Sequence, residues 1–103
     1  MNRKHIFLAM FRALDCLYDE SPSKPLGDFL SEANPYLFKD RCSADPAVFA
    51  EFSACMDGDN ISAADAYSKV KEYLAGKELD EKFAEISMEE WERLCQIIEN
   101  EER

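Results

Sequence analysis

Residues 3–19 read RKHIFLAMFRALDCLYD, and their apolar side chains recur at helical spacing. The positions that lie three or four residues apart on one face are Ile6, Met10, Leu14 and Leu17. The other apolar residues of the segment widen this face to more than half of the circumference. A helix with so wide an apolar surface needs partners on several sides, so we predict that it lies at the centre of the fold.

Proline and small polar residues mark where this helix ends and a second one follows. Ser21-Pro22-Ser23 breaks the first helix, and Pro25 suits the first turn of the next. Pro35 disfavours the α conformation at Asn34 and ends the second helix. The side chains expected to face inward from it are Leu26, Phe29, Leu30 and Ala33.

Two further helices are predicted by their end signals. Asp45-Pro46 is typical of an N-cap followed by the first helical residue, and residues 57–60 end that third helix. Ser62 and Asp65 resemble a capping box for a fourth helix, with Gly76 at its C-terminal cap. The inward residues expected of the third helix are Val48, Phe49, Phe52, Cys55 and Met56, and those of the fourth are Ala63, Ala66, Tyr67, Val70, Tyr73 and Leu74.

The C-terminal quarter predicts a short helix over about residues 78–85 and a longer one that begins at Ser87. Glu90 completes a capping box with Ser87, and Ile86 is placed to pack on Trp91 as a hydrophobic staple. The inner face expected of the last helix consists of Met88, Trp91, Leu94, Cys95 and Ile98.

Together these segments predict an all-α fold. We expect a single helical domain over residues 1–103, a compact bundle of five or six short helices around the central N-terminal helix. Apolar residues make up 47% of the chain, which suffices for one buried core at this length. No segment alternates apolar and polar residues for long enough to predict a strand.

The charge of the chain is strongly negative and uneven. The net charge is −10 at pH 7, and residues 78–103 carry ten acidic and three basic side chains. Nucleic acids and anionic membranes attract clustered lysine and arginine, and this sequence has no such cluster, so we expect neither as a partner. We expect a cytoplasmic protein, because no apolar stretch has the length of a membrane span and Arg12 interrupts the first apolar run too early for a signal peptide.

The cysteines and acidic turns do not predict a metal site. Cysteines 16, 42, 55 and 95 are too far apart for a paired ligand motif, and we expect Cys16, Cys55 and Cys95 to be small apolar core residues. Residues 57–62 are similar to the middle of a calcium loop. With Asp57 as the first ligand, however, Ile61 and Ser68 fall at ligand positions five and twelve. We expect neither a metal nor another cofactor.

Catalytic chemistry has few candidates in this sequence. The single histidine, His5, lies near the start of the first helix with no nucleophile pattern around it, so we expect a solvated or end-capping side chain. The three glycines are isolated, which excludes a glycine-rich phosphate loop. We therefore expect no enzyme and no catalytic residues, although a Cys–His dyad stays open.

Two surface segments are candidates for binding a partner. Tyr36, Phe38 and Arg41 lie in an irregular loop over residues 34–45, and aromatic residues with arginine are enriched in interface hot spots. The alternative is that the two aromatic side chains fill the core.

The second candidate is an acidic stripe on the last helix. Its residues Glu89, Glu92 and Glu99 fall within about 80° of one another on the helical projection. Arg93 and Arg103 stand four residues after two of them, whereas Glu92 has no such partner. The alternative is a face that is only solvated.

These features predict a small acidic protein-binding module that recognises another protein of basic character. An immunity-type inhibitor of a nuclease is a concrete version, because carboxylates can occupy positions where phosphates would bind. One alternative is a ligand-binding or enzymatic domain with a pocket near the polar side of the first helix, which would use Arg12 or Cys16. Another is a structural subunit that self-associates into a homo-oligomer.

Overall fold

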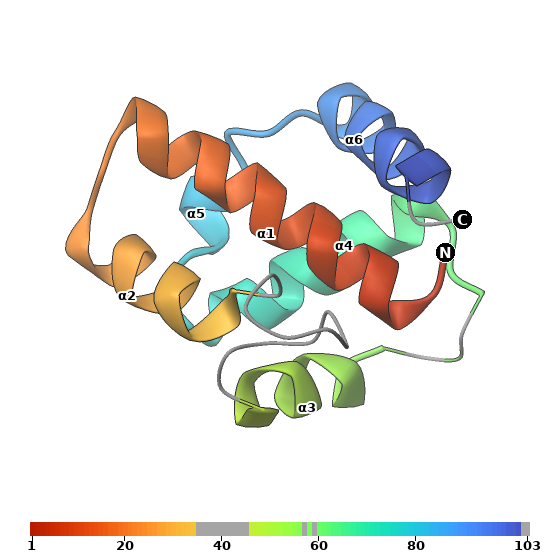
Figure 1. Ribbon diagram of the computed structural model, residues 1–103, viewed down its shortest axis with the longest axis horizontal. Coiled ribbons are helices and arrows are strands. Elements are labelled where there is room, and N and C mark those ends of the chain that lie inside the picture. The colour runs from red at the N-terminus through yellow and green to blue at the C-terminus, as the bar shows by residue number, and fades with distance from the viewer. Residues whose placement is uncertain (35–45, 57, 59, 102–103) are drawn as a thin grey trace.

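The computed structural model describes residues 1–34, 46–56, 58 and 60–101, and these residues form six helices and no strand. This confirms the predicted all-α fold. Figure 1 shows α1 crossing the middle of the molecule with the other helices arranged around it. The bounds in chain order are α1 (Arg3–Glu20), α2 (Lys24–Ala33), α3 (Pro46–Ala54), α4 (Ala63–Ala75), α5 (Asp80–Phe83) and α6 (Met88–Glu101).

The central place of α1 follows from its wide apolar surface. The helix packs against α2, α3, α5 and α6, so side chains on most of its circumference are covered. Leu14 is fully buried, as predicted. The radius of gyration is 12.4 Å, close to the roughly 13 Å of a compact domain of about 100 residues. The buried residues of α1 are Ile6, Phe7, Leu8, Ala9, Met10, Phe11, Ala13, Leu14 and Leu17.

The predicted starts of α2 and α4 are confirmed. Pro25 lies in the first turn of α2, and the Ser62 hydroxyl accepts a hydrogen bond from the backbone N–H of Asp65 at 3.2 Å. At the start of α1 the Asn2 side chain accepts from the backbone N–H of His5 at 2.8 Å. The Asp45 cap expected for α3 lies outside the described residues.

α6 begins with the capping box that the sequence predicts. The backbone N–H of Glu90 donates to Ser87 Oγ at 3.1 Å, and the backbone N–H of Ser87 faces Glu90 Oε1 at 3.5 Å. Trp91 is fully buried and Ile86 packs at the edge of the same core. The helix therefore starts at the predicted residue.

The end of α4 differs from the prediction in its mechanism. Gly76 caps the helix but keeps right-handed backbone angles, and the left-handed residue is Glu78, with φ 60°. Its N–H donates to Ala75 O at 3.2 Å, and the N–H of Leu79 donates to Leu74 O at 2.9 Å. These two bonds form a Schellman motif. Because this turn uses residues 76–79, α5 starts at Asp80 rather than at about residue 78, and it ends at Phe83, before the predicted end at residue 85.

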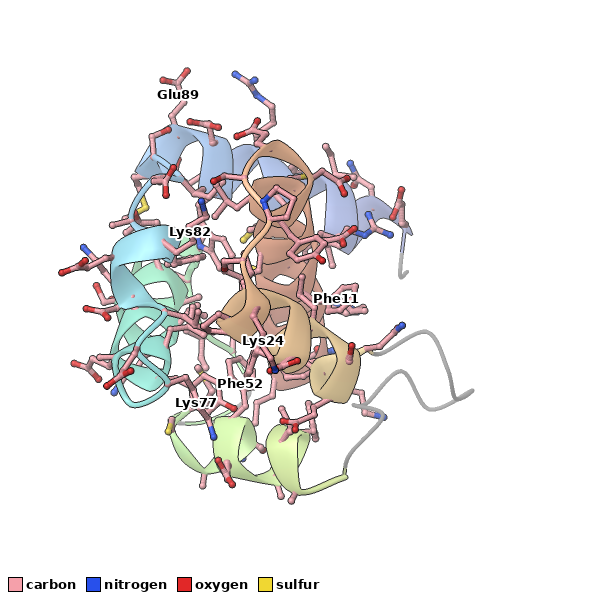
Figure 2. All side chains as sticks on the ribbon, turned by 90° about the vertical axis from the view of Figure 1, so that its left-hand side faces the viewer. Phe11, Lys24, Phe52, Lys77, Lys82 and Glu89 are labelled. Atoms are coloured by element: carbon pink, nitrogen blue, oxygen red, sulfur yellow. The ribbon has the colours of Figure 1, made fainter. Side chains whose placement is uncertain are left out.

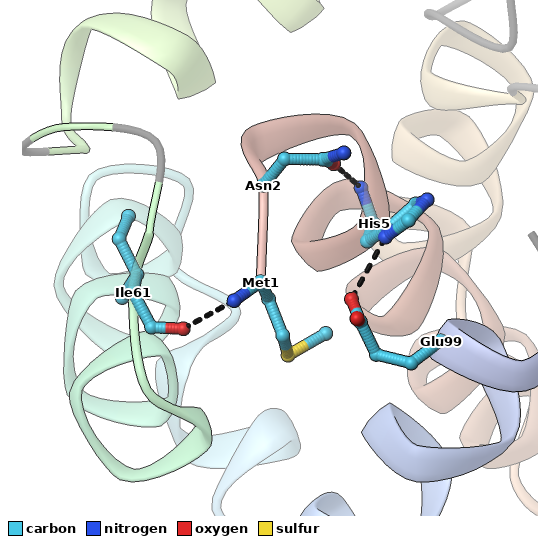
Figure 3. Close-up of polar contacts among 5 residues, drawn as sticks. All are labelled: Met1, Asn2, His5, Ile61 and Glu99. Atoms are coloured by element: carbon cyan, nitrogen blue, oxygen red, sulfur yellow. Dashed lines mark hydrogen bonds and ion pairs between the residues drawn. The ribbon is translucent and has the colours of Figure 1, made fainter. Parts of the chain in front are cut away.

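The N-terminus is tied to the segment before α4. The amino group of Met1 donates to Ile61 O at 2.8 Å (Figure 3), and the N–H of Ile61 donates to Met1 O at 3.0 Å. Arg3 donates to Gly58 O at 3.1 Å and to Ser53 Oγ at 3.0 Å. These contacts hold the turn after α3 against the start of α1.

Three residues predicted to face the core do not. Cys16 and Cys55 are exposed, and Met88 is 37% exposed, whereas Cys95 is buried as expected. Cys16 lies on the side of α1 that faces an open groove, Cys55 follows the last residue of α3, and Met88 is the first residue of α6. The apolar face that the sequence predicts for a helix is thus longer or wider than the surface that neighbouring helices cover.

Candidate functional site

A groove of about 410 Å³ lies between the C-terminal half of α1 and the N-terminal part of α6. Its apolar walls come from α1, from α6 and from the turn before α6. Figure 1 shows α6 lying along one side of α1. The apolar lining residues are Ala13, Cys16, Leu17, Ile86, Leu94 and Ile97.

The apolar surface of the groove runs from the core to the exterior. Leu17 is buried at its base, Leu94 is half-buried, and Ile97 is 44% exposed at its edge. Leu94 and Ile97 are three residues apart on α6, beside the face that buries Trp91, so one helix supplies both core and groove side chains. Short side chains at Ala13 and Cys16 leave the space that the groove occupies.

Charged residues surround this apolar surface, and three of the four are acidic. The carboxylate of Glu85 lies 3.3 Å from Lys82 Nζ, and Glu90 is held by the capping box. Glu20 is exposed and forms no ion pair within the described part of the chain. Among the described lining residues the one cation is Arg93, which lies 3.8 Å from a carboxylate of Glu89. The edge of the groove therefore carries net negative charge.

A hydrogen bond and an ion pair join α1 and α6. His5 Nδ1 lies 2.8 Å from Glu99 Oε1 (Figure 3), and Arg12 Nη1 lies 2.7 Å from Glu101 Oε2. The expectation of a merely solvated or end-capping His5 was wrong, because its ring bridges two helices. Arg12 does not line the groove, so the alternative pocket near the first helix includes Cys16 but lacks the arginine expected of it.

The predicted acidic stripe is only partly exposed. Glu89 and Glu92 are exposed, and Figure 2 shows Glu89 pointing away from the molecule. Glu99 is half-buried, and its carboxylate faces His5 of α1. The ion pair predicted between Glu89 and Arg93 is present, and Glu92 forms none within the described residues.

The other predicted binding segment is the loop over residues 34–45. Tyr36, Phe38 and Arg41 lie outside the described residues, as does Arg103. Sequence reasoning also missed Glu20, Leu94 and Ile97 as parts of one surface. The available signal was the helical spacing of residues 90, 93, 94 and 97, but its meaning depends on where α1 lies.

Neither a metal cluster nor a membrane-spanning helix is found in the part of the chain that the structure describes. No three His, Cys, Asp or Glu side chains there gather closely enough to hold a metal ion. None of the six helices is both long and apolar enough to cross a bilayer.

The fold and the groove together define an all-α domain with an acidic, partly apolar surface cleft. Comparison with protein-family models, curated proteins and solved structures finds no match. Function is accordingly inferred from the groove and the surface charges.

Proposed function

We propose that this chain is a protein-binding module that recognises a basic partner protein. The observation that carries the proposal is the groove between α1 and α6, where an apolar base is bordered by three carboxylates and one arginine. Interfaces combine an apolar centre with a polar edge, and a negative edge selects a positive partner.

The unpaired carboxylates support the same proposal. Within the described residues, the carboxylates of Glu99 and Glu101 contact side chains of α1. Glu20 and Glu92 form no ion pair there. Exposed like charges repel one another and add nothing to folding stability, but they accelerate the approach of a cationic partner. An inhibitor of immunity type, which covers the basic site of a nuclease, is the specific form that this charge favours.

The groove also favours a second candidate, a small-molecule site. Its volume of about 410 Å³ falls in the range of roughly 300–1,000 Å³ that such sites occupy. Cys16 is exposed there, but no histidine is among the lining residues, and His5 is engaged with Glu99. A protein segment fits better, because the apolar surface continues outward to Ile97 rather than closing over a ligand.

A peptide selection tests the first candidate. Peptides from a random library displayed on phage are selected for binding to the immobilised protein at low salt. The enriched peptides are then synthesised for affinity measurements. We expect sequences with net positive charge and at least one large apolar residue, whose affinity falls as salt rises. Selection of neutral or acidic sequences would contradict the proposal.

Association rates of the selected peptide provide the matched control. Replacing Glu89 and Glu92 with glutamine should slow association at low salt and flatten its salt dependence. The control removes the same charge from α2 through Asp28→Asn and Glu32→Gln, far from α6 in Figure 1. Equal slowing in both variants would show that net charge alone, and not the α6 surface, attracts the peptide.

A further inference from the structure

Building on the proposed function, we propose that the groove between α1 and α6 holds a short amphipathic, cationic segment of the partner. An apolar side chain of that segment enters between Leu17, Leu94 and Ile97. Lysine or arginine side chains on either side of it reach the carboxylates at the groove edge.

The apolar half of this proposal follows from exposure. Met88 and Ile97 are the large apolar side chains left exposed among the described residues, and Ile97 is the one that lines the groove. It lines the groove together with half-buried Leu94 and buried Leu17. Covering these side chains with an apolar side chain of the partner removes them from water and is favourable. A groove of this size accommodates a few side chains rather than a whole helix face.

The cationic half follows from the charges that remain available. Glu20 has no ion pair within the described residues, and the exposed carboxylate of Glu85 lies 3.3 Å from the partly buried Lys82, three residues earlier in the chain. Arg93 is the one cation at the edge and already faces Glu89. A cation arriving at the groove therefore meets carboxylates without displacing a buried contact.

The same charges argue against a second copy of this chain as the occupant. Two identical grooves brought together would place the same acidic edges against each other, and like charges in contact oppose association. The net charge of −10 adds repulsion at longer range. A partner segment of opposite charge meets neither penalty.

Cysteine alkylation locates the bound peptide. Cys16 is exposed and lines the groove, Cys55 is exposed after the end of α3 outside it, and Cys95 is buried. Iodoacetamide labelling is followed at each cysteine by peptide mass mapping, with and without saturating amounts of the selected cationic peptide. We expect roughly tenfold slower labelling of Cys16 and no change at Cys55, because occupied sites exclude solvent and reagent. Unchanged labelling of Cys16 with peptide bound would overturn the proposed location.

Paired substitutions test the apolar contact and the charge contact of the proposal separately. Ile97→Gln should weaken peptide binding roughly tenfold, whereas Met88→Gln, an equally exposed apolar residue of α6 outside the groove, should not. Glu20→Gln should weaken binding, whereas Asp19→Asn next to it should change it little. All four side chains lie at the surface or at the groove edge, so the variants should fold, which circular dichroism checks. Equal effects within each pair would overturn the proposal.

The outcomes separate this inference from the function on which it rests. If the library yields no cationic peptide, the proposed function fails. If a cationic peptide binds without protecting Cys16, that function stands and the groove assignment fails. A second copy of this chain is the remaining possible occupant, and sedimentation of the free protein at several concentrations tests it. A dimer that dissociates when Ile97 is replaced by glutamine would assign the groove to the second copy and overturn the inference.

Discussion

Glu78 is the one non-glycine residue with a left-handed backbone in the described part of the chain. Its φ of 60° lets the chain leave α4 through two hydrogen bonds and turn into α5. A side chain with a Cβ costs about 1–2 kcal/mol in this conformation, whereas glycine adopts it freely. The turn is therefore maintained by its hydrogen bonds and by buried Leu79, against the preference of the residue itself.

Glu78→Gly should stabilise the protein by about 0.5–1 kcal/mol. The gain is smaller than the strain because glycine also makes the unfolded chain more flexible. Urea unfolding measures the difference. Glu78→Ala is the control, since it removes the same charge but retains the Cβ, and it should bring no gain. A glycine variant no more stable than the alanine variant would show that the turn is not strained.

Cys95 and Tyr73 are the residues whose acid–base properties the fold changes most clearly. Burial raises the pKa of the Cys95 thiol from 9.0 to about 12, with a further contribution from the carboxylate of Glu99. Burial likewise raises the pKa of Tyr73 from 10.0 to about 12, and Glu51 adds to the shift. In alkali the unfolded chain loses these protons before the folded chain does.

Stability should therefore be independent of these two groups below pH 9 and should fall as the pH rises from 9 towards 12. Urea unfolding at a series of alkaline pH values measures this loss. Cys95→Ala removes one titration, so its stability should fall less steeply between pH 9 and 12 than that of the wild type. Tyr73→Phe removes the other. Identical slopes in all three proteins would contradict the assigned pKa shifts.

At the scale of elements, the start of α6 is held by side chains of its own first turn. Ser87 and Glu90 satisfy backbone groups that have no partner within the helix. Two contacts from α1, the hydrogen bond of His5 to Glu99 and the ion pair of Arg12 with Glu101, hold the other end of α6. The groove lies between the two helices that these contacts keep in place, so its shape depends on them.

Ser87→Ala should cost about 0.5–2 kcal/mol of unfolding free energy, because it removes the hydrogen bond to the Glu90 N–H. Ser23→Ala is a matched control: Ser23 occupies the N-cap of α2 but its side chain makes no cap hydrogen bond. It should cost clearly less. Chemical denaturation of both variants checks the ordering, and the reverse ordering would show that the capping box does not stabilise α6.

At the scale of the whole molecule, stability rests on the single core around α1. Leu14 is fully buried in it, so Leu14→Ala should cost about 2–5 kcal/mol, the range for a large cavity in a core. Met88→Ala, at the surface of α6, should change the unfolding free energy by about 0.5 kcal/mol or less. Urea unfolding compares the two. A loss below about 1 kcal/mol for Leu14→Ala would show that α1 is not central.

The sequence by itself determined the helices and the central role of α1. The spacing of Ile6, Met10, Leu14 and Leu17 and the caps at Ser62 and Ser87 are local signals, which act within one or two helical turns. Apolar stripes and N-caps need no knowledge of distant residues. For this reason the helix starts and most of the core were predictable.

Only the tertiary structure decided which faces are covered and which carboxylates are paired. Cys16 and Met88 continue apolar stripes but lie where no neighbouring helix covers them. Glu99 was predicted to belong to an exposed stripe, and the packing of α6 against α1 brings it to His5 instead. The groove exists because residues about 80 positions apart in sequence meet across two helices, and that spacing leaves no local pattern. Contacts of this kind depend on the whole packing arrangement, which periodicity does not encode.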